Sequence, residues 1–498
     1  MIERLRIVYE RLTAGGSTAE KALQSGIWVA GINVTDRILQ LLKVIILARL
    51  LSPAAFGLLG IALLVIAALR QFSKLGFDEA LIQHQDDDVD AYLNTAWVMK
   101  IVRGFGIAVV AFLAAPYLAV FFSEPQAEPV IRVVGVTPFI LSLQNPGVMY
   151  FEKNLNFHKE FVYQVGGRLV DLVVAVVLAL TFRSVWALVA GIVAMNFVKF
   201  ILSYAIHEYR PNIEFNLAYG KEMFGFGKWL LVSAILSFLY GQGDDAFVGW
   251  FFAASSLGVY QLAYRFSNAP ATEVTHVISR VAFPTMSRVQ NDTEKLREGF
   301  RRAVQLSTTV AFPMAAGIAA VAPQFVPVVL GDQWRSGIPV IQVLAVYGGI
   351  RAFGANVGAV YNSTGRPDIG AKIQALQAIA LAAVIYPAAE WFGLMGVSFA
   401  VVISLILPLP ISLHYVLSIT QLRAIELVKL IMFPLMSSIV MAGSVIALNV
   451  YILTGESVFA FTLLIATGCM VYFALMYIFE HLFNAEFIQL YRIVKQGI

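Results

Sequence analysis

The feature that most constrains this fold is a succession of apolar runs about twenty residues long, which recur from Ser25 to Leu482 with few charges inside them. An α-helix of this length spans the hydrocarbon core of a bilayer. Only 13% of the 498 residues are charged, whereas soluble domains carry about 25%. Barrel strands would instead show short alternating segments. The sequence therefore predicts an all-α polytopic membrane protein.

We count about fourteen transmembrane helices in the predicted fold, with short connections between them. The spans are expected near residues 25–50, 55–80, 92–121, 128–151, 160–182, 184–206, 224–252, 257–283, 300–330, 336–361, 370–391, 394–417, 427–450 and 457–482. The single cysteine, Cys469, excludes an intrachain disulfide and a cysteine-based metal site. No soluble catalytic domain fits between the spans, so we expect neither an enzyme nor a metal or organic cofactor.

The basic residues in the loops predict the orientation in the membrane. With the N-terminus in the cytoplasm, nineteen loop Lys and Arg residues lie inside, and only Arg183 and Arg335 lie outside. An even number of spans then places both termini in the cytoplasm. The acidic loop at 83–90 must also lie inside. Residues 1–24 alternate basic and apolar side chains, which indicates an amphipathic helix on the inner leaflet rather than a signal peptide.

Weak similarity between two halves of the chain predicts an internal repeat of six spans. The segment at 54–58 recurs at 255–259 with an offset of 201 residues, and the segment at 186–188 recurs at 395–397. A third repeat motif matches Asn145, Gly147 and Tyr150 with Asn356, Gly358 and Tyr361 at an offset of 211. Because six is even, the two copies have the same orientation. We expect two parallel six-helix lobes, at 25–210 and 211–420, and two C-terminal helices within 421–498.

Polar and charged residues inside the spans indicate a water-filled cavity between the lobes. A charge at the centre of a membrane helix costs about 2.5–3.5 kcal/mol, so such residues are expected to pair with one another or to line water. The cavity candidates are Arg37, Gln40, Lys100, Arg103, Arg168, Arg265 and Asn268. Arg168 and Asp171, three residues apart, can also form a purely structural pair. A cavity rich in guanidinium and ammonium groups favours an anionic cargo, and phosphate matches the guanidinium fork.

The repeat also predicts a gate. The offset of 201 aligns Lys43 of the first span with Asp244 of the seventh. We expect Lys43 to pair with Asp244 or Asp245 when the protein is open to the cytoplasm. Such a buried pair can break when cargo arrives, because its desolvation cost can exceed its Coulomb energy.

The end of the first span reads Ala48-Arg49-Leu50-Leu51-Ser52-Pro53 and is followed by Ala55-Phe56-Gly57-Leu58. This segment resembles the opening of Wzx-type polysaccharide flippases, which share the MOP superfamily with MATE exporters and lipid II flippases. The subgroup resembled most is that of colanic-acid and teichuronic-acid exporters, and the resemblance extends over all fourteen spans. It implies alternating access in the cytoplasmic (inner) membrane. The implied cargo is an oligosaccharide on undecaprenyl pyrophosphate, carried from the inner to the outer leaflet with its headgroup in a basic cavity.

The resemblance further allows coupling to Na⁺ or H⁺ and association with membrane lipids and a polysaccharide polymerase complex, and it implies no nucleic-acid partner. The alternative is a MATE-like multidrug or cation antiporter, whose cavity should be acidic or aromatic. Asp244 and Asp245 keep this alternative open. A polytopic glycosyltransferase acting on the same lipid carrier would need a large extramembrane loop, which the span pattern does not provide.

Overall fold

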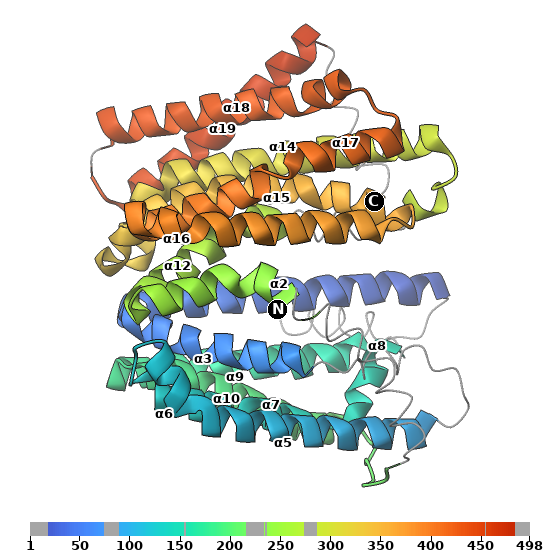
Figure 1. Cartoon of the computed structure of the whole chain (residues 1–498), viewed down its shortest axis with the longest axis vertical. Helices are drawn as coiled ribbons and strands as arrows, with labels where there is room; N and C mark the ends of the chain where they lie inside the picture. Colours follow the sequence, from blue (N-terminus) through green and yellow to red (C-terminus); the bar gives the residue numbers. More distant parts are fainter. Residues whose placement is uncertain are drawn as a thin grey trace, which may run out of the picture. The chain divides into compact units, whose positions relative to one another are not determined.

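The computed structural model confirms an all-α membrane fold (Figure 1). Nine helices in the described part of the chain are long and apolar enough to cross a membrane, and one of them, Pro367–Thr420, is long enough to cross twice. The predicted amphipathic segment before residue 18 and most of the acidic loop at 83–90 lie outside the described residues. The structure describes residues 18–73, 89–153, 156–215, 234, 237–272, 286–453 and 455–483.

The chain divides into two compact units. The first unit comprises Met1–Phe238 and Gly249–Gly258, and the second unit comprises Leu239–Val248 and Val259–Ile498. The predicted lobe boundaries at residues 210 and 420 stay predictions. Each unit is described separately below.

In the first unit, long helices pack around small buried residues. α3 begins at the N-cap Ser52, whose Oγ accepts the Ala55 amide, and Pro53 occupies the first helical position, where its missing N–H costs nothing. α9 packs along both α2 and α10. The helices are α2 (Thr18–Leu50), α3 (Pro53–Phe72), α5 (Val89–Phe121), α6 (Ala127–Val134), α7 (Thr137–Ser142), α8 (Tyr150–Lys153), α9 (Phe157–Phe182) and α10 (Val185–Ile206).

The predicted span at 128–151 is not one helix. The structure divides it into α6, α7, the short 3₁₀ helix at Pro146–Met149 and α8. Pro138 is the second residue of α7 and Pro146 is the first residue of the 3₁₀ helix, and neither has an N–H group for an intrahelical bond. The Asn145 side chain caps the 3₁₀ helix by accepting the Gly147 amide at 2.9 Å. Proline and capping chemistry therefore override the apolar run.

The second unit is built mainly from long helices that alternate in direction (Figure 1). α16 bends at Gly393, which adopts a positive φ of +59°, so the two spans predicted at 370–391 and 394–417 meet at a glycine. The helices are a segment at 237–251, α12 (Ala254–Ser267), α14 (Thr293–Phe325), α15 (Ile338–Ser363), α16 (Pro367–Ile406), α17 (Leu409–Thr420), α18 (Ala424–Tyr451) and α19 (Val458–Phe483). Residues 254–258 of α12 belong to the first unit, as do residues 237–238 and 249–251 at the two ends of the 237–251 segment.

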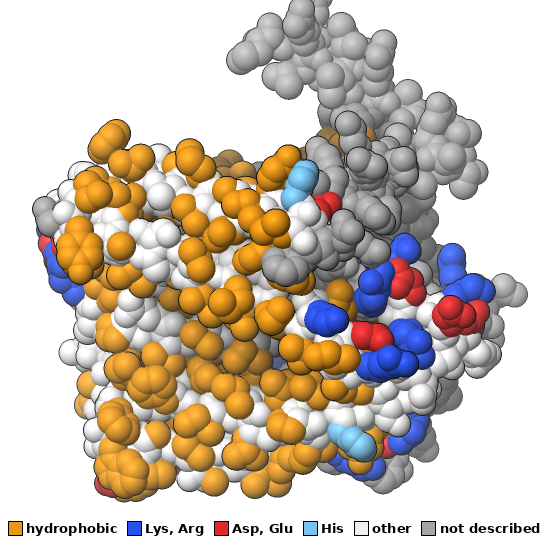
Figure 2. All heavy atoms as spheres, turned by 90° about the horizontal axis from the view of Figure 1, so that it is seen from above, with side chains coloured by type: hydrophobic (Ala, Val, Ile, Leu, Met, Phe, Trp, Pro, Cys, Tyr) orange, Lys and Arg blue, Asp and Glu red, His pale blue; other side chains and the backbone are white. Residues whose placement is uncertain are grey.

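The surface of the second unit has the polarity that a bilayer requires. Figure 2 shows one largely apolar face on which most charged side chains gather toward one edge. Charged pairs lie where α14, α16 and α18 begin: Lys295 with Asp292, Lys372 with Asp368 and Arg423 with Glu426. Since α15 and α17 end beside these starts, the basic loops share one end of the unit.

The two segments that the offset of 201 residues relates make a reciprocal contact within the first unit. A Cβ atom added to Gly57 would lie 1.7 Å from the Ala254 carbonyl oxygen, and one added to Gly258 would lie 2.1 Å from the Pro53 carbonyl oxygen. Residues 53 and 254, and 57 and 258, are each 201 apart. The starts of α3 and α12 thus touch backbone to backbone, which only glycine at these two positions permits.

Candidate functional site

Four charged residues join α2 and α9 in the first unit. Lys43 Nζ contacts Asp171 Oδ1 at 2.5 Å, and Arg168 Nε donates to Asp36 Oδ1 at 2.7 Å. The Asp171 side chain is 2% exposed, so its charge would be costly without a cation beside it. The two cations and two carboxylates neutralise one another and cross-link the helices.

The predicted pairing within α9 also forms, although it is longer than the pairs between helices. Arg168 Nη1 lies 3.6 Å from Asp171 Oδ2. Arg168 therefore contacts two carboxylates, and its spacing predicted the contact to Asp171 but not the one to Asp36. Its assignment to a substrate cavity stays a prediction.

The other cavity candidates of the first unit are Arg37, Gln40, Lys100 and Arg103, and they lie on α2 and α5. Arg37 is exposed on α2 and lies 3.5 Å from Gln40 Oε1. Arg103 donates to the Ser73 hydroxyl at 3.0 Å and to the carbonyl oxygen of Arg70, near the end of α3. Beside Arg103 lies an apolar pocket of about 720 Å³, also lined by Phe72. Lys100 is half-buried on α5.

The predicted gate carboxylates are held within the second unit. Asp244 is buried and accepts a hydrogen bond of 2.7 Å from the Tyr260 hydroxyl. Asp245 accepts a hydrogen bond from the Gln261 side chain, while its buried Oδ1 atom has no hydrogen-bond partner among the described residues. Lys43 belongs to the first unit, where it contacts Asp171, so the gate pairing stays a prediction.

Sequence reasoning overlooked Arg351, which is the most distinctive charge in the second unit. It is half-buried and is the fourteenth of the 26 residues of α15. Its Nη1 atom donates to the Tyr264 hydroxyl and to Asn268 Oδ1, both at 3.2 Å, and its guanidinium lies 5.9 Å from the centre of the Tyr347 ring. The sequence signal for Arg351 was a single arginine at the middle of a predicted span. It was overlooked because no stripe of polar residues accompanies it, as one does in other spans.

Two predicted cavity residues of the second unit have different positions. Asn268 is buried and holds Arg351 through its side-chain oxygen. Arg265 is exposed, one helical turn earlier. Asn268 therefore belongs to a polar cluster around Arg351, a residue that was not predicted from the sequence.

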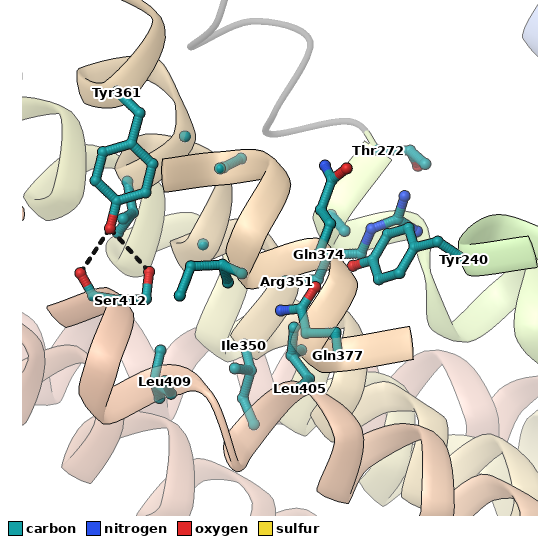
Figure 3. Close-up of a pocket in the computed structure, with 17 residues that line it drawn as sticks. Tyr240, Thr272, Ile350, Arg351, Tyr361, Gln374, Gln377, Leu405, Leu409 and Ser412 are labelled. Carbon is teal, nitrogen blue, oxygen red and sulfur yellow. Dashed lines mark hydrogen bonds between the residues drawn. The ribbon is translucent and has the colours of Figure 1, made fainter. Parts of the chain in front are cut away.

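A cavity of about 400 Å³ lies beside Arg351 within the second unit (Figure 3). Figure 3 shows Arg351, Gln374, Gln377 and the Tyr240 ring close to one another on one side of it. On the other side, the Tyr361 hydroxyl donates to the Ser412 carbonyl oxygen at 2.7 Å. Among the described residues that line this cavity, Arg351 is the only one that carries a charge.

The repeat motif at an offset of 211 residues places its two asparagines in different backbone environments. Asn145 precedes the 3₁₀ helix, and its Nδ2 donates to the Tyr209 carbonyl oxygen at 2.6 Å. Asn356 lies inside α15, where its Nδ2 donates to Ser307 Oγ at 2.7 Å. Both are buried. The remaining motif residues also differ: Gly147 lies in the 3₁₀ helix and Tyr150 begins α8, whereas Gly358 and Tyr361 line the cavity.

Solved structures of membrane transporters share this fold. The lipid II flippase MurJ, in its inward closed conformation, superposes with a TM-score of 0.72 at 13% sequence identity, over 91% of this chain and 99% of that chain. An inward-facing multidrug resistance MATE family transporter of the MOP superfamily gives a TM-score of 0.63 at 16% identity, over 78% of this chain and 96% of that chain.

Relatives by sequence cover a large part of the chain. The lipopolysaccharide biosynthesis protein WzxC of Escherichia coli (strain K12) is 27% identical over 77% of this chain and 78% of its own length. The teichuronic acid biosynthesis protein TuaB of Bacillus subtilis (strain 168) is 26% identical over 59% of this chain and 61% of its own length. The family model described as polysaccharide biosynthesis protein matches residues 46–339. The chain belongs to this polysaccharide biosynthesis protein family.

Proposed function

We propose that the chain is a flippase that moves an oligosaccharide linked to undecaprenyl pyrophosphate from the inner to the outer leaflet by alternating access. The observation that carries this proposal is membership of the polysaccharide biosynthesis family by a chain built from membrane helices. The described residues form no domain outside the helices that could hold a synthetic active site. A family member of this construction contributes to polysaccharide formation by transport rather than by catalysis, so we infer that it is not an enzyme.

The named functions of relatives support transport of a lipid-linked glycan. The succinoglycan biosynthesis transport protein ExoT of Rhizobium meliloti (strain 1021) is 28% identical over 63% of this chain and 63% of its own length. The fold shared with the lipid II flippase is compatible with the same task, although the 13% identity supports the fold alone. The cargo class follows from these names together with the cations inside the spans.

We further propose that Asp245 takes the coupling ion, Na⁺ or H⁺. In the part of the chain that the structure describes, no hydrogen-bond partner reaches its buried Oδ1 atom, and the preceding residue is the buried carboxylate Asp244. Two adjacent carboxylates in a region of low dielectric repel each other, so a proton or a cation between them would lower the energy of the pair. Transport measured across imposed Na⁺ or H⁺ gradients identifies the ion, and an Asp245→Asn variant should lose the dependence on that gradient. An unchanged dependence would contradict the assignment.

We propose an orientation with the basic loops of the second unit in the cytoplasm, both termini inside, and the inner membrane as the location. Cys469 is the only cysteine of the chain, so a Cys469→Ser background allows single cysteines to be introduced. A membrane-impermeant thiol reagent added to intact cells should label Gly455→Cys and not Asn362→Cys, both of which lie at exposed positions. The reverse pattern would overturn the orientation.

Reconstitution tests the central proposal. Purified protein in liposomes is given a short-chain polyprenyl-pyrophosphate oligosaccharide with a fluorescent sugar, and a membrane-impermeant reductant then bleaches only the label in the outer leaflet. A flippase should make nearly all label accessible, whereas about half stays protected in protein-free liposomes. If the label stays protected and the liposomes instead accumulate a cationic dye, the chain is a MATE-like antiporter.

A further inference from the structure

We propose that Arg351 and the cavity beside it bind a carboxylate-bearing sugar of the cargo glycan, a second anion site separate from any that holds the pyrophosphate. This inference rests on the proposed function and adds to it the chemical class of the sugar. The first step of the argument is the state of the guanidinium. Both hydrogen bonds of Arg351 to described residues go to neutral groups, and both use the same nitrogen, Nη1. Its Nε and Nη2 atoms therefore remain available. Among the described residues, the carboxylate that acts on Arg351 electrostatically is Asp244, which accepts a hydrogen bond from Tyr260.

The second step is the contrast with other buried charges in the chain. Lys43 and Arg168 each contact a carboxylate inside the first unit. Arg351 lies at the middle of a helix about 39 Å long, which is where a cation without a counter-ion is most costly. No carboxylate of the described residues lies within ion-pair distance of it. An arginine kept in such a place without direct contact to a described carboxylate is expected to meet an external anion.

The third step is the lining of the cavity. Gln377 is buried, and neither it nor Gln374 has a hydrogen-bond partner among the described residues. Gln374 is exposed, so this point rests on Gln377. A buried amide is normally satisfied, and one that faces a cavity without a partner among the described residues indicates a polar occupant. The Tyr240 ring adds an aromatic face of the kind that sugars stack on. These groups come from the 237–251 segment, α15 and α16, all within the second unit.

The chemistry of these groups selects the ligand. One guanidinium binds one carboxylate in a bidentate fork, and two amides can exchange hydrogen bonds with neighbouring hydroxyl groups. A pyrophosphate carries more than one charge and would require further cations, whereas Arg351 is the only charged residue among the described lining. A volume of about 400 Å³ accommodates a sugar ring with room to spare. A uronic acid, or a sugar with another carboxyl substituent, fits this donor set.

The experiment compares two cargo molecules in the reconstituted assay. Both are fluorescent short-chain polyprenyl-pyrophosphate disaccharides, and they differ only in a terminal glucuronic acid or glucose. Arg351→Gln should lower the ratio of acidic to neutral flipping roughly tenfold to a hundredfold, the value of a charge-assisted bidentate contact. Arg351→Lys should recover part of this ratio, since lysine keeps the charge and lacks the fork. The matched control Arg366→Gln, at an exposed arginine on the basic end, should keep the wild-type ratio.

The outcomes separate this inference from the proposed function. An unchanged ratio in Arg351→Gln overturns the sugar site while the flippase assignment stands. An equal loss for both cargo molecules overturns it too, because Arg351 would then contact the shared pyrophosphate. If the wild-type protein flips neither cargo, the proposed function fails, and binding of methyl glucuronide to the purified protein still decides the site. Wild-type binding that Arg351→Gln abolishes supports the site, and equal binding or none by both proteins overturns it.

Discussion

The two units treat their buried cations in opposite ways. In the first unit, Lys43 and Arg168 contact Asp171 and Asp36, and the network has no net charge. In the second unit, Arg351 is held by a tyrosine hydroxyl, an asparagine oxygen and an aromatic ring. Paired charges join helices to each other, whereas a cation held by neutral groups keeps its electrostatic attraction for a ligand. The same residue type thus serves structure in one unit and, we infer, recognition in the other.

The largest expected effect breaks the charge network of the first unit. Asp171→Asn removes the carboxylate that Lys43 contacts and leaves that ammonium group without its buried counter-ion. We expect a loss of about 3 kcal/mol or more in the free energy of unfolding, because a buried charge deprived of its partner is strongly destabilising. Thermal unfolding of the purified protein in detergent measures it. A double variant, Lys43→Met with Asp171→Leu, should recover most of the stability, and wild-type stability of the single variant would refute a structural network.

A second prediction compares glycines of the two units. Gly57→Ala should lose about 1–3 kcal/mol of stability, because its Cβ atom would overlap the Ala254 carbonyl oxygen and force the helices apart. Gly358, at the cavity of the second unit, has nothing within 4 Å of an added Cβ atom, so Gly358→Ala serves as the matched control and should be no less stable than wild type. Equal stability of the two variants would contradict this prediction, because α3 and α12 would then separate without a loss in the free energy of unfolding.

A third prediction concerns Arg351 itself. Arg351→Gln should change the free energy of unfolding by no more than about 1 kcal/mol, since the loss of two hydrogen bonds is offset by removal of a partly buried cation that no described carboxylate contacts directly. The same unfolding assay provides the comparison with Asp171→Asn. A loss as large as that of Asp171→Asn would place Arg351 among the structural charges and weaken its assignment to a ligand.

The smallest expected effect is a pH dependence at the end of α10. Burial, and then the nearby charge of Lys159, lowers the pKa of His207, and its Nδ1 atom accepts the Tyr209 amide, as only the neutral ring can. The unfolded chain then binds more protons than the folded one below the ordinary histidine pKa of about 6.5. Stability should be constant above that value and fall as the pH drops through the folded-state pKa. His207→Gln should reduce this fall, and an identical pH profile for both proteins would contradict the assignment.

The sequence predicted the helices well because apolar runs of fixed length leave few alternatives in a bilayer. It failed at 128–151, where Pro138 and Pro146 divide an apolar run, and it placed a boundary correctly at Gly393, where the helix bends. The offset of 201 residues was also informative, since Gly57 approaches the backbone of Ala254 and Gly258 approaches the backbone of Pro53. Helix-breaking residues and segments that recur at a fixed offset can both be recognised in a linear sequence.

The contact partners of the charged residues could not be predicted from the sequence in this way. The i, i+3 pair of Arg168 and Asp171 followed from helix geometry, but the contacts to Asp36 and Lys43 depend on how α2 packs against α9. Arg351 was missed because it belongs to no polar stripe, and its significance depends on cavity-facing amides from α16. Pairing and cavity formation are properties of the packed helices.

The most direct test of the central claim is leaflet exchange by the reconstituted protein. A fluorescent polyprenyl-pyrophosphate disaccharide ending in glucuronic acid should become fully accessible to an external reductant in liposomes that contain the protein. The Arg351→Gln variant should favour the glucose-terminated cargo at least about tenfold more than the wild-type protein does. Protection of half the label in the presence of the wild-type protein, as in protein-free liposomes, would contradict the claim that this chain moves lipid-linked glycans.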